Sequence, residues 1–455
     1  MDKVTLREKI SYGLYNCGQN FFFTIIGFMT TYYTDIGIGA ASVAVIALIT
    51  KVWDAINDPI FGAIMDKVHF KKGKFIPWLR ISLLAIPITT ILLFMIPSNI
   101  PMPAKLLWAT LSYMLWDTAY TICDVPNFGL VTTMTDDLGE RKNLNFVRSL
   151  FSLIAGIAVG SIVPAFRQAL GGWTSTAVTV SLIGVLTMLP ICLFGKERVM
   201  DIEKQNHEEE HYGIKDMFRC VRTNKYLLIF FSANIISSML GVGSAWSIYI
   251  ARYCLGGEEM ASVVTLVSVV PMLIGTVLAP VLCKKHDKFK VLYGSVILGF
   301  ILNIVKFLVG YQNITLFMIA SALTAFPTGI ILMVGFQFTP DCYEYGRYKT
   351  GLNMRGVTFA VQTFSAKISS ALATFVSTFS LTLIGFVEGE NAVQPAGMDM
   401  RLWVVSCVGT LLGNIVMLII YRFYKLNDHD VQLMVKSNIG EISREEAEAQ
   451  MINKY

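Results

Sequence analysis

Charged residues are scarce in this chain of 455 residues, where Asp, Glu, Lys and Arg together make up 15%. Soluble domains carry about 25%. Hydrophobic residues account for 54%, and apolar runs recur along the whole sequence. Many of these runs approach the roughly 20 residues that a helix needs to cross a hydrocarbon core. A soluble protein could not bury so much apolar surface, so the sequence predicts an all-α polytopic membrane protein.

Several other signals are also missing. The 8 cysteines include no Cys-x-x-Cys pair and lie mostly within apolar runs, which argues against disulfides and metal ligands. The N-terminal MDKVTLREKI lacks the short apolar core of a cleaved signal peptide, so the first span is expected to be retained. The basic residues lie in loops, and no nucleic-acid partner is expected. Because the long loops offer no nucleophile–base pair, neither an enzyme nor a cofactor is predicted.

About twelve transmembrane spans are predicted, with about 20 residues as the unit. One set of connections is rich in Lys and Arg, whereas the other set has few, as in YTDIGIGAAS. By the positive-inside rule, both termini are expected in the cytoplasm, with the protein in a bacterial-type cytoplasmic (inner) membrane. The spans cover approximately residues 16–36, 42–65, 76–97, 105–130, 147–169, 176–195, 226–252, 260–283, 290–311, 315–339, 357–386 and 402–424.

A long polar segment near the middle of the chain divides the predicted spans six and six. Two six-helix halves joined by a cytoplasmic linker are typical of major-facilitator-type transporters, with the site between the halves at the membrane midplane. The predicted organisation is an N-terminal half at 1–195, a linker at 196–225, a C-terminal half at 226–425 and a cytoplasmic tail at 426–455.

Two aspartates interrupt the second predicted span, although each costs about 2.5–3.5 kcal/mol at the centre of a membrane helix. Asp54, Asn57 and Asp58 share one helix face. Their oxygens suit Na⁺ or Li⁺, and a carboxylate can instead take a proton. Pro59 releases the carbonyl of Ala55 from the helix ladder, which adds an acceptor. The alternative is that one aspartate forms a structural ion pair with another helix.

The fourth predicted span repeats this pattern in LWDTAYTICDVPNF. Asp117, Thr121 and Asp124 are spaced to share a face, and Tyr120 lies one turn before Asp124. A carboxylate accepts hydrogen bonds from sugar hydroxyls, and a tyrosine offers an aromatic face with a polar tip. Purely structural roles for Asp117 and Asp124 stay open.

Other charges have predicted partners across the two halves. Lys367, within the eleventh span, needs a carboxylate partner, and we expect it to balance the aspartates of the second and fourth spans. On the cytoplasmic side, Asp66 and Lys67 have counterparts in Asp341 and Glu344. Such charges suit a salt-bridge latch that forms when the inner side is closed, although solvated loop charge is the simpler alternative.

Five motifs together resemble the glycoside–pentoside–hexuronide:cation symporters, the family of the melibiose permease, over nearly the whole chain. They are EKISYGLYNCGQN, WDAINDPIFGAIMD, YTICDVP, DCYEYGRYKTG and VQTFSAK. The resemblance implies a Na⁺-, Li⁺- or H⁺-coupled sugar symporter that works by alternating access. The first helix departs from the family pattern, because Gln19 and Asn20 stand where the melibiose permease has adjacent Lys and Asp that contact sugar. Galactoside specificity is therefore not expected.

The resemblance also implies roles for individual residues. The cation site would comprise Asp54, Asn57, Asp58 and Thr121, with Asp54 and Asp58 as metal ligands if the ion is Na⁺ or Li⁺. The substrate site would comprise Gln19, Asn20, Tyr120, Asp124, Arg148 and Lys367. A cytoplasmic gate would comprise Arg141, Asp341 and Glu344.

The predicted function is cation-coupled import of a glycoside, oligosaccharide or sugar acid. The expected partners are a small-molecule substrate and membrane lipid, and a monomer is expected. A proton-coupled exporter of small amphipathic compounds on the same fold and a transporter-like nutrient sensor are the alternatives. The choice between Na⁺ and H⁺ stays open, because carboxylates serve both.

Overall fold

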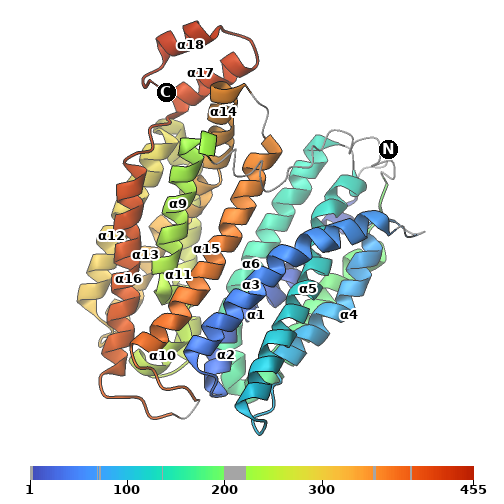
Figure 1. Ribbon diagram of the computed structural model, residues 1–455, viewed down its shortest axis with the longest axis vertical. Helices are drawn as coiled ribbons and strands as arrows, with labels where there is room; N and C mark the ends of the chain where they lie inside the picture. The colour runs from blue at the N-terminus through green and yellow to red at the C-terminus, as the bar shows by residue number, and fades with distance from the viewer. Residues whose placement is uncertain are drawn as a thin grey trace. The chain divides into compact units, whose positions relative to one another are not determined.

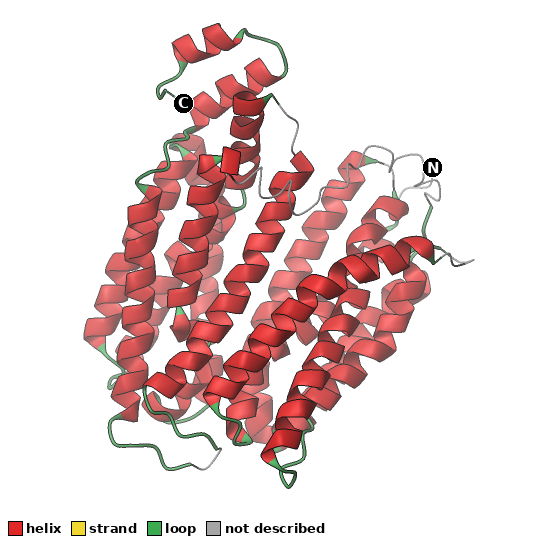
Figure 2. Ribbon diagram, in the orientation of Figure 1, coloured by secondary structure: helices red, strands yellow, loops and turns green. Residues whose placement is uncertain are grey.

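The computed structural model describes residues 4–68, 70, 73–135, 137–198, 222–351, 355–389 and 392–454. Within these ranges, all regular structure is helical (Figures 1 and 2). Most of the predicted linker, residues 199–221, lies outside them. The first helices are α1 (Leu6–Ile26), α2 (Met29–Asp35), α3 (Ala40–Lys67), α4 (Ile76–Leu93), α5 (Met102–Met134), α6 (Leu138–Leu170) and α7 (Trp173–Phe194). The later ones are α9 (Lys225–Leu240), η3 (Val242–Ser244), α10 (Ser247–Cys254), α11 (Glu259–Lys285), α12 (Lys288–Val309), α13 (Ile314–Gly335), α14 (Phe338–Thr350), α15 (Arg355–Leu383), α16 (Met398–Tyr421), α17 (Asp428–Asn438) and α18 (Arg444–Gln450).

The chain forms two compact units. Unit 1 comprises Met1–His207, Gly256–Thr265 and Thr378–Met398. Unit 2 comprises Glu208–Leu255, Leu266–Ser377 and Asp399–Tyr455. Two segments from the second half of the sequence therefore belong to the first unit. The simpler division into halves and a linker stays a prediction.

Nine helical segments of the described residues are long and apolar enough to cross a membrane. The first, fourth and seventh predicted spans, which correspond to α1–α2, α5 and α9–α10, are not among them. Helices α1 and α5 carry polar residues that lower their hydropathy, among them Gln19 and Asp117, both of which are buried. Helix α9 has only 16 residues. Two of the three exceptions, α1 and α5, are thus among the helices that supply the candidate site.

The first predicted span is interrupted at Gly27 and Phe28. The N–H groups of these residues bond to the carbonyls of Thr24 and Ile25, which are three residues back rather than four. Helix α1 therefore ends at Ile26, and α2 begins at Met29. The predicted span at 16–36 thus covers the second half of the 21-residue α1 and the whole of the seven-residue α2.

Unit 1 is a bundle in which α1 packs on α6 and α7, α4 on α5 and α7, and α3 on α5. Close approach of α1 to α7 depends on small residues, because a Cβ on Gly18 would lie 2.5 Å from the carbonyl oxygen of Gly184. In unit 2, α12 packs on α13, while α14 contacts both α9 and the tail helix α17. Helix α5 therefore lies against both α3 and α4.

Glu197 anchors the start of α4. Its carboxylate accepts the backbone N–H groups of Lys74 at 2.9 Å, Phe75 at 2.9 Å and Ile76 at 2.8 Å. Ile76 is the first residue of the helix, Phe75 is its N-cap and Lys74 precedes the cap. N–H groups at this end of a helix lack intrahelical partners, and the dipole favours an anion there. Gly73 has φ +118°, and a Cβ there would lie 2.5 Å from the Glu197 Oε1 atom. The Glu197 carboxylate can therefore approach this closely only because residue 73 is a glycine, which has no Cβ and tolerates a positive φ.

Replacing Glu197 with alanine is expected to lower stability by about 2–3 kcal/mol, because charge-assisted bonds to three backbone donors are lost. Glu197→Gln retains one acceptor oxygen and should fall between alanine and wild type. The measurement is the apparent Tm of the purified protein in detergent. Alanine at Glu441, an exposed glutamate of the tail, is the matched control. An unchanged Tm for Glu197→Ala would show that the cap contributes nothing.

Candidate functional site

The polar face of α3 meets α5 through Thr121. The side-chain amide of Asn57 donates to the Thr121 Oγ1 atom at 2.8 Å, and the Thr121 hydroxyl lies 3.0 Å from Asp58 Oδ1. Asp54, Asn57 and Thr121 are buried. The structure thus brings the predicted cation-site residues together on two adjacent helices.

The hydroxyl of Thr121 has two acceptors for a single proton. Besides Asp58, it lies 3.1 Å from the backbone carbonyl of Asp117, one turn earlier on α5. When the proton points to that carbonyl, a lone pair of the Thr121 oxygen is free to coordinate a cation bound beside Asp58. The hydroxyl can therefore stabilise the Asp58 carboxylate or act as a cation ligand without moving its oxygen.

Lys51 lies beside these aspartates and was missed in the sequence analysis. Its Nζ atom is 3.9 Å from Asp54 Oδ2, and it also interacts electrostatically with Asp58, Asp117 and Tyr113. The signal was visible in ALITKVWDAIND, where the lysine precedes Asp54 by three residues inside an apolar run. The structure therefore gives the aspartates a basic neighbour on their own helix.

A second polar cluster joins α1 to α5 around Gln19. Its side-chain amide donates to Asp124 Oδ1 and to the hydroxyl of Tyr120, the latter at 3.3 Å. Asn127 in turn donates to Gln19 Oε1 at 2.7 Å and to Asn16 Oδ1 at 2.8 Å. Asn127 and Asn16 had not been predicted as members. Gln19 thus contacts two other predicted substrate-site residues, Tyr120 and Asp124.

Asn20 and Arg148 lie at the edges of this second cluster. Asn20 donates to the Ser152 hydroxyl of α6 at 2.9 Å. The guanidinium of Arg148 lies 3.6 Å from the centre of the Phe128 ring. A cation is attracted to the face of an aromatic ring, so the contact between Arg148 and Phe128 stabilises the positions of both side chains.

The remaining predicted residues have partners within their own units. Arg141 donates to the carbonyl of Thr135 at 2.9 Å, Asp341 pairs with Lys288 at 2.7 Å, and Glu344 accepts from Asn438 at 2.8 Å. Their role as a gate stays a prediction, and the side chains of Asp66 and Lys67 lie outside the described residues. Lys367 is a partly buried residue of α15 in unit 2, and its role also stays a prediction.

A buried charge cluster lies at the α2–α3 end of unit 1. The Arg167 guanidinium pairs with Asp35 Oδ2 at 3.0 Å and with Glu258, and the Trp173 indole donates to the same Asp35 oxygen at 2.9 Å. Nearby, Glu388 accepts the N–H group of Ala40 at 2.8 Å. Glu258 and Glu388 come from the second half of the sequence. These contacts therefore hold the segments Gly256–Thr265 and Thr378–Met398 to the rest of unit 1.

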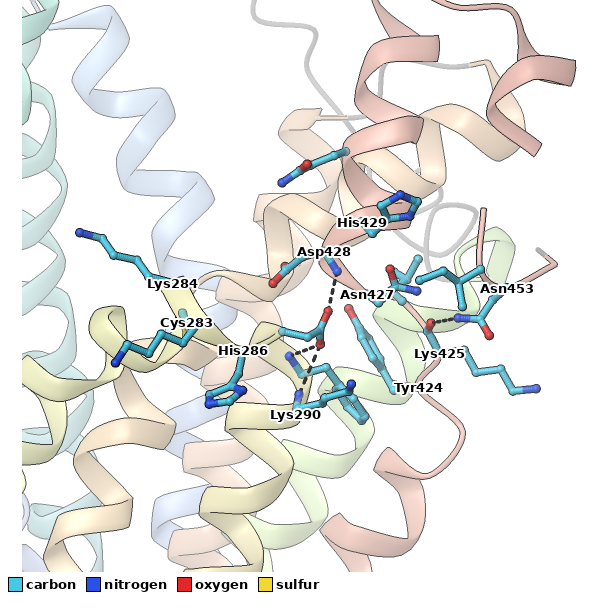
Figure 3. A pocket seen from close by; sticks show the side chains of 16 residues that line it. Cys283, Lys284, His286, Lys290, Tyr424, Lys425, Asn427, Asp428, His429 and Asn453 are labelled. Carbon is cyan, nitrogen blue, oxygen red and sulfur yellow. Dashed lines mark hydrogen bonds between the residues drawn. The ribbon is translucent and has the colours of Figure 1, made fainter. Parts of the chain in front are cut away.

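A separate pocket of about 570 Å³ lies in unit 2 between the α11–α12 and α16–α17 connections (Figure 3). Lys284, Lys285 and Lys290 are among the residues that line it. Its two carboxylates cap each other's helices, because the Asp428 N–H donates to Asp287 at 2.7 Å and the Lys288 N–H donates to Asp428 at 2.9 Å. These two contacts therefore attach the tail to the start of α12. The residues that line the pocket are remote in sequence from both polar clusters.

Comparison with known proteins identifies the type of protein. The model of the family described as MFS/sugar transport protein matches residues 10–428. The "Uncharacterized symporter YjmB" of Bacillus subtilis is 29% identical, with 94% of each chain covered. The "Putative sulfoquinovose importer" of Escherichia coli is 27% identical, with 95% of this chain and 94% of the relative covered. The "Putative 2,3-dihydroxypropane-1-sulfonate exporter" of Salmonella typhimurium is 25% identical, with 94% of each covered.

The fold is also that of solved transporters. The nucleoside transporter NupG superposes with a TM-score of 0.63 at 14% identity, over 92% of this chain and 99% of that one. The predicted fold class, and the prediction of a transporter rather than an enzyme, are confirmed. The names of the relatives agree with the resemblance found in the motifs. The chain belongs to the MFS/sugar transport protein family and is a membrane transporter of the major facilitator fold.

Proposed function

We propose that this protein is a symporter that imports a sugar, glycoside or sugar acid, coupled to Na⁺, Li⁺ or H⁺. The observation that carries the proposal is the position of the two clusters on consecutive residues of α5. Tyr120 accepts from Gln19 in the candidate substrate cluster, and Thr121 contacts Asn57 and Asp58 in the candidate cation cluster. A shift of α5 on cation binding would therefore reach the substrate cluster directly.

The Gln19–Asp124 pair provides the chemistry for hydroxyl recognition. In the structure, the amide N–H of the buried Gln19 donates to the carboxylate of the partly buried Asp124, so the two groups are paired with each other. A sugar hydroxyl can both donate to Asp124 and accept from Gln19, and can thus replace this bond with two. Tyr120, stacked on Trp116 at 5.1 Å, offers a rigid aromatic surface beside it.

The names of relatives support a carbohydrate substrate and leave direction to experiment. Two relatives are named a symporter and a sulfoquinovose importer, whereas a third is named an exporter of a small sulfonate. Import is proposed because the polar cluster of Gln19, Asn20 and Asp124 suits a hydroxylated solute rather than an amphipathic one. Export on the same fold is the competing function that the third relative favours.

The test is a panel of glycosides and uronates offered to the purified protein in liposomes. We expect a Na⁺, Li⁺ or proton gradient to drive accumulation of at least one compound. A sensor would bind without accumulating, and a proton-driven exporter would move its substrate against the direction of the proton. Either result would overturn the proposal.

Replacing Asp124 with asparagine is expected to weaken substrate binding at least tenfold, because hydrogen bonds to charged groups contribute about 1.5–3 kcal/mol. Calorimetric titration with the compound identified in the panel measures this change. Binding of the cation alone should persist, since Asp124 contacts Gln19 of the substrate cluster. Equal substrate affinity in Asp124→Asn and wild type would remove Asp124 from the substrate site.

A further inference from the structure

Lys51 places a permanent positive charge inside the candidate cation cluster. It lies in the middle of α3, a membrane-spanning helix, and its side chain is 24% exposed. A lysine at that depth is costly and is kept where carboxylates surround it. Asp54 lies one turn further along α3 at 3.9 Å, and Asp58, Asp117 and Tyr113 also interact with the ammonium. The surrounding groups come from both α3 and α5.

The net charge of this cluster depends on Lys51. The three carboxylates of Asp54, Asp58 and Asp117 and the single ammonium of Lys51 leave two negative charges when all are ionised. Two aspartates alone would leave the same net charge. The charges of Lys51 and Asp117 sum to zero, so together they leave the net charge of the cluster unchanged. Removal of either one alone would change that net charge by one.

We propose that Lys51 is a tethered cation whose single charge offsets one of the two carboxylates of Asp54 and Asp117, with Asp54 as its ion-pair partner, so that Asp58, with Asn57 and Thr121, forms the seat for a single coupling cation. The inference rests on the proposed function and deepens it, because it gives the two α3 aspartates different roles. Asp54 is the counter-ion of an internal ammonium, whereas Asp58 binds the external ion.

The contacts of the two aspartates support this division. Asp54 has the ammonium of Lys51 on its own helix, 3.9 Å away. Asp58 contacts the hydroxyl of Thr121, which is held by the amide of Asn57 at 2.8 Å. A carboxylate, a hydroxyl and an amide are the oxygen donors that a hard cation takes, whereas an ammonium repels such an ion. The external ion is therefore favoured at the Asp58 end.

The experiment compares single and charge-balanced double variants of the purified protein. The readout is the apparent Tm as a function of NaCl, with choline chloride at constant ionic strength, and the half-saturating Na⁺ concentration is taken from it. Lys51→Gln should lower that concentration, and Asp117→Asn should raise it, by about tenfold each, as expected for one nearby charge. Lys51→Gln/Asp117→Asn and Lys51→Gln/Asp54→Asn should lie within about threefold of wild type.

Asp58→Asn should lose the Na⁺ response altogether. If Lys51→Gln/Asp54→Asn loses it too, Asp54 is a direct ligand and the inference is wrong. An unchanged half-saturating concentration in Lys51→Gln would also overturn it. Lys105→Gln is the matched control, since this lysine of α5 donates to the carbonyl of Ile36, outside the cluster, and should leave the Na⁺ response unchanged.

Failure of the proposed function would look different. If wild type responds to neither Na⁺ nor Li⁺, metal coupling is excluded, and the Tm values in choline chloride still test the pairing. Each single variant should then melt about 5 °C lower, because a buried charge has lost its partner, and the balanced doubles should recover most of that loss. Additive losses in the doubles would refute the role of Lys51 as a counter-ion.

Discussion

Replacing Asp58 with asparagine is expected to abolish cation-stimulated uptake. Asp58 is the aspartate of α3 that contacts the Thr121 hydroxyl, and an amide supplies one neutral oxygen where the carboxylate supplied a charge. Loss of a buried charge partner costs about 3–5 kcal/mol. Each 1.4 kcal/mol is about tenfold, so cation affinity should fall at least about a hundredfold. Uptake into liposomes with and without a cation gradient measures the effect.

A matched substitution separates this effect from general damage. Asp137 caps the start of α6 by accepting the Glu140 N–H at 2.7 Å. Asparagine caps helices about as well as aspartate, so Asp137→Asn should leave both stability and cation stimulation unchanged. Cation-stimulated uptake that survives in Asp58→Asn would remove this aspartate from the coupling site.

Replacing Arg167 with glutamine is expected to open the α2–α3 end of unit 1. The guanidinium bridges two carboxylates, Asp35 and Glu258, and both would be left without their buried cation. The cost of breaking a buried pair is about 3–5 kcal/mol, enough to move a two-state equilibrium by about a hundredfold or more. Since Glu258 belongs to a segment from the second half of the sequence, that segment is expected to separate from α2 and α6.

Disulfide cross-linking measures this opening. A Cβ at Gly160 of α6 would lie 3.7 Å from the Cγ2 atom of Thr265, in the segment that carries Glu258, so cysteines at both positions should cross-link on oxidation, with the product quantified by mass spectrometry. The yield should fall severalfold or more in Arg167→Gln. Arg198→Gln breaks an equally close pair with Glu8, at the start of α1, and should not reduce the yield. Equal yields in Arg167→Gln and its parent would show that this cluster does not hold the end closed.

The membrane spans could be predicted from the sequence because burial in lipid imposes long apolar runs with charged connections. Each predicted span overlaps a helix, or in three cases two consecutive α-helices, and the clustering of Asn57, Asp58 and Thr121 follows from helical spacing plus one correct pairing of helices. The break after Ile26 was not predicted, since Gly27 and Phe28 carry no proline or charge that would mark it.

The partners of charged residues were harder to predict from the sequence than the membrane spans. Asp341 pairs with Lys288, which lies 53 positions away in the sequence, and only the packing of unit 2 brings them together. Lys51 was overlooked for a different reason, because a single lysine within an apolar run contributes little to any periodic pattern. The Arg167 cluster joins residues near the ends of α2, α6 and α7 to Glu258, which precedes α11, and its members become a group only when the fold is known.

The break between α1 and α2 has a mechanical consequence. Helix α1 carries Gln19 of the substrate cluster, whereas α2 ends at Asp35 in the Arg167 cluster. A continuous rod would transmit every displacement of one cluster to the other. With a joint at Gly27–Phe28, α2 can tilt with the segments that it binds while α1 keeps its register against α7. Release of the Arg167 contacts and reorganisation of the substrate contacts are thereby separable steps that selection could tune independently.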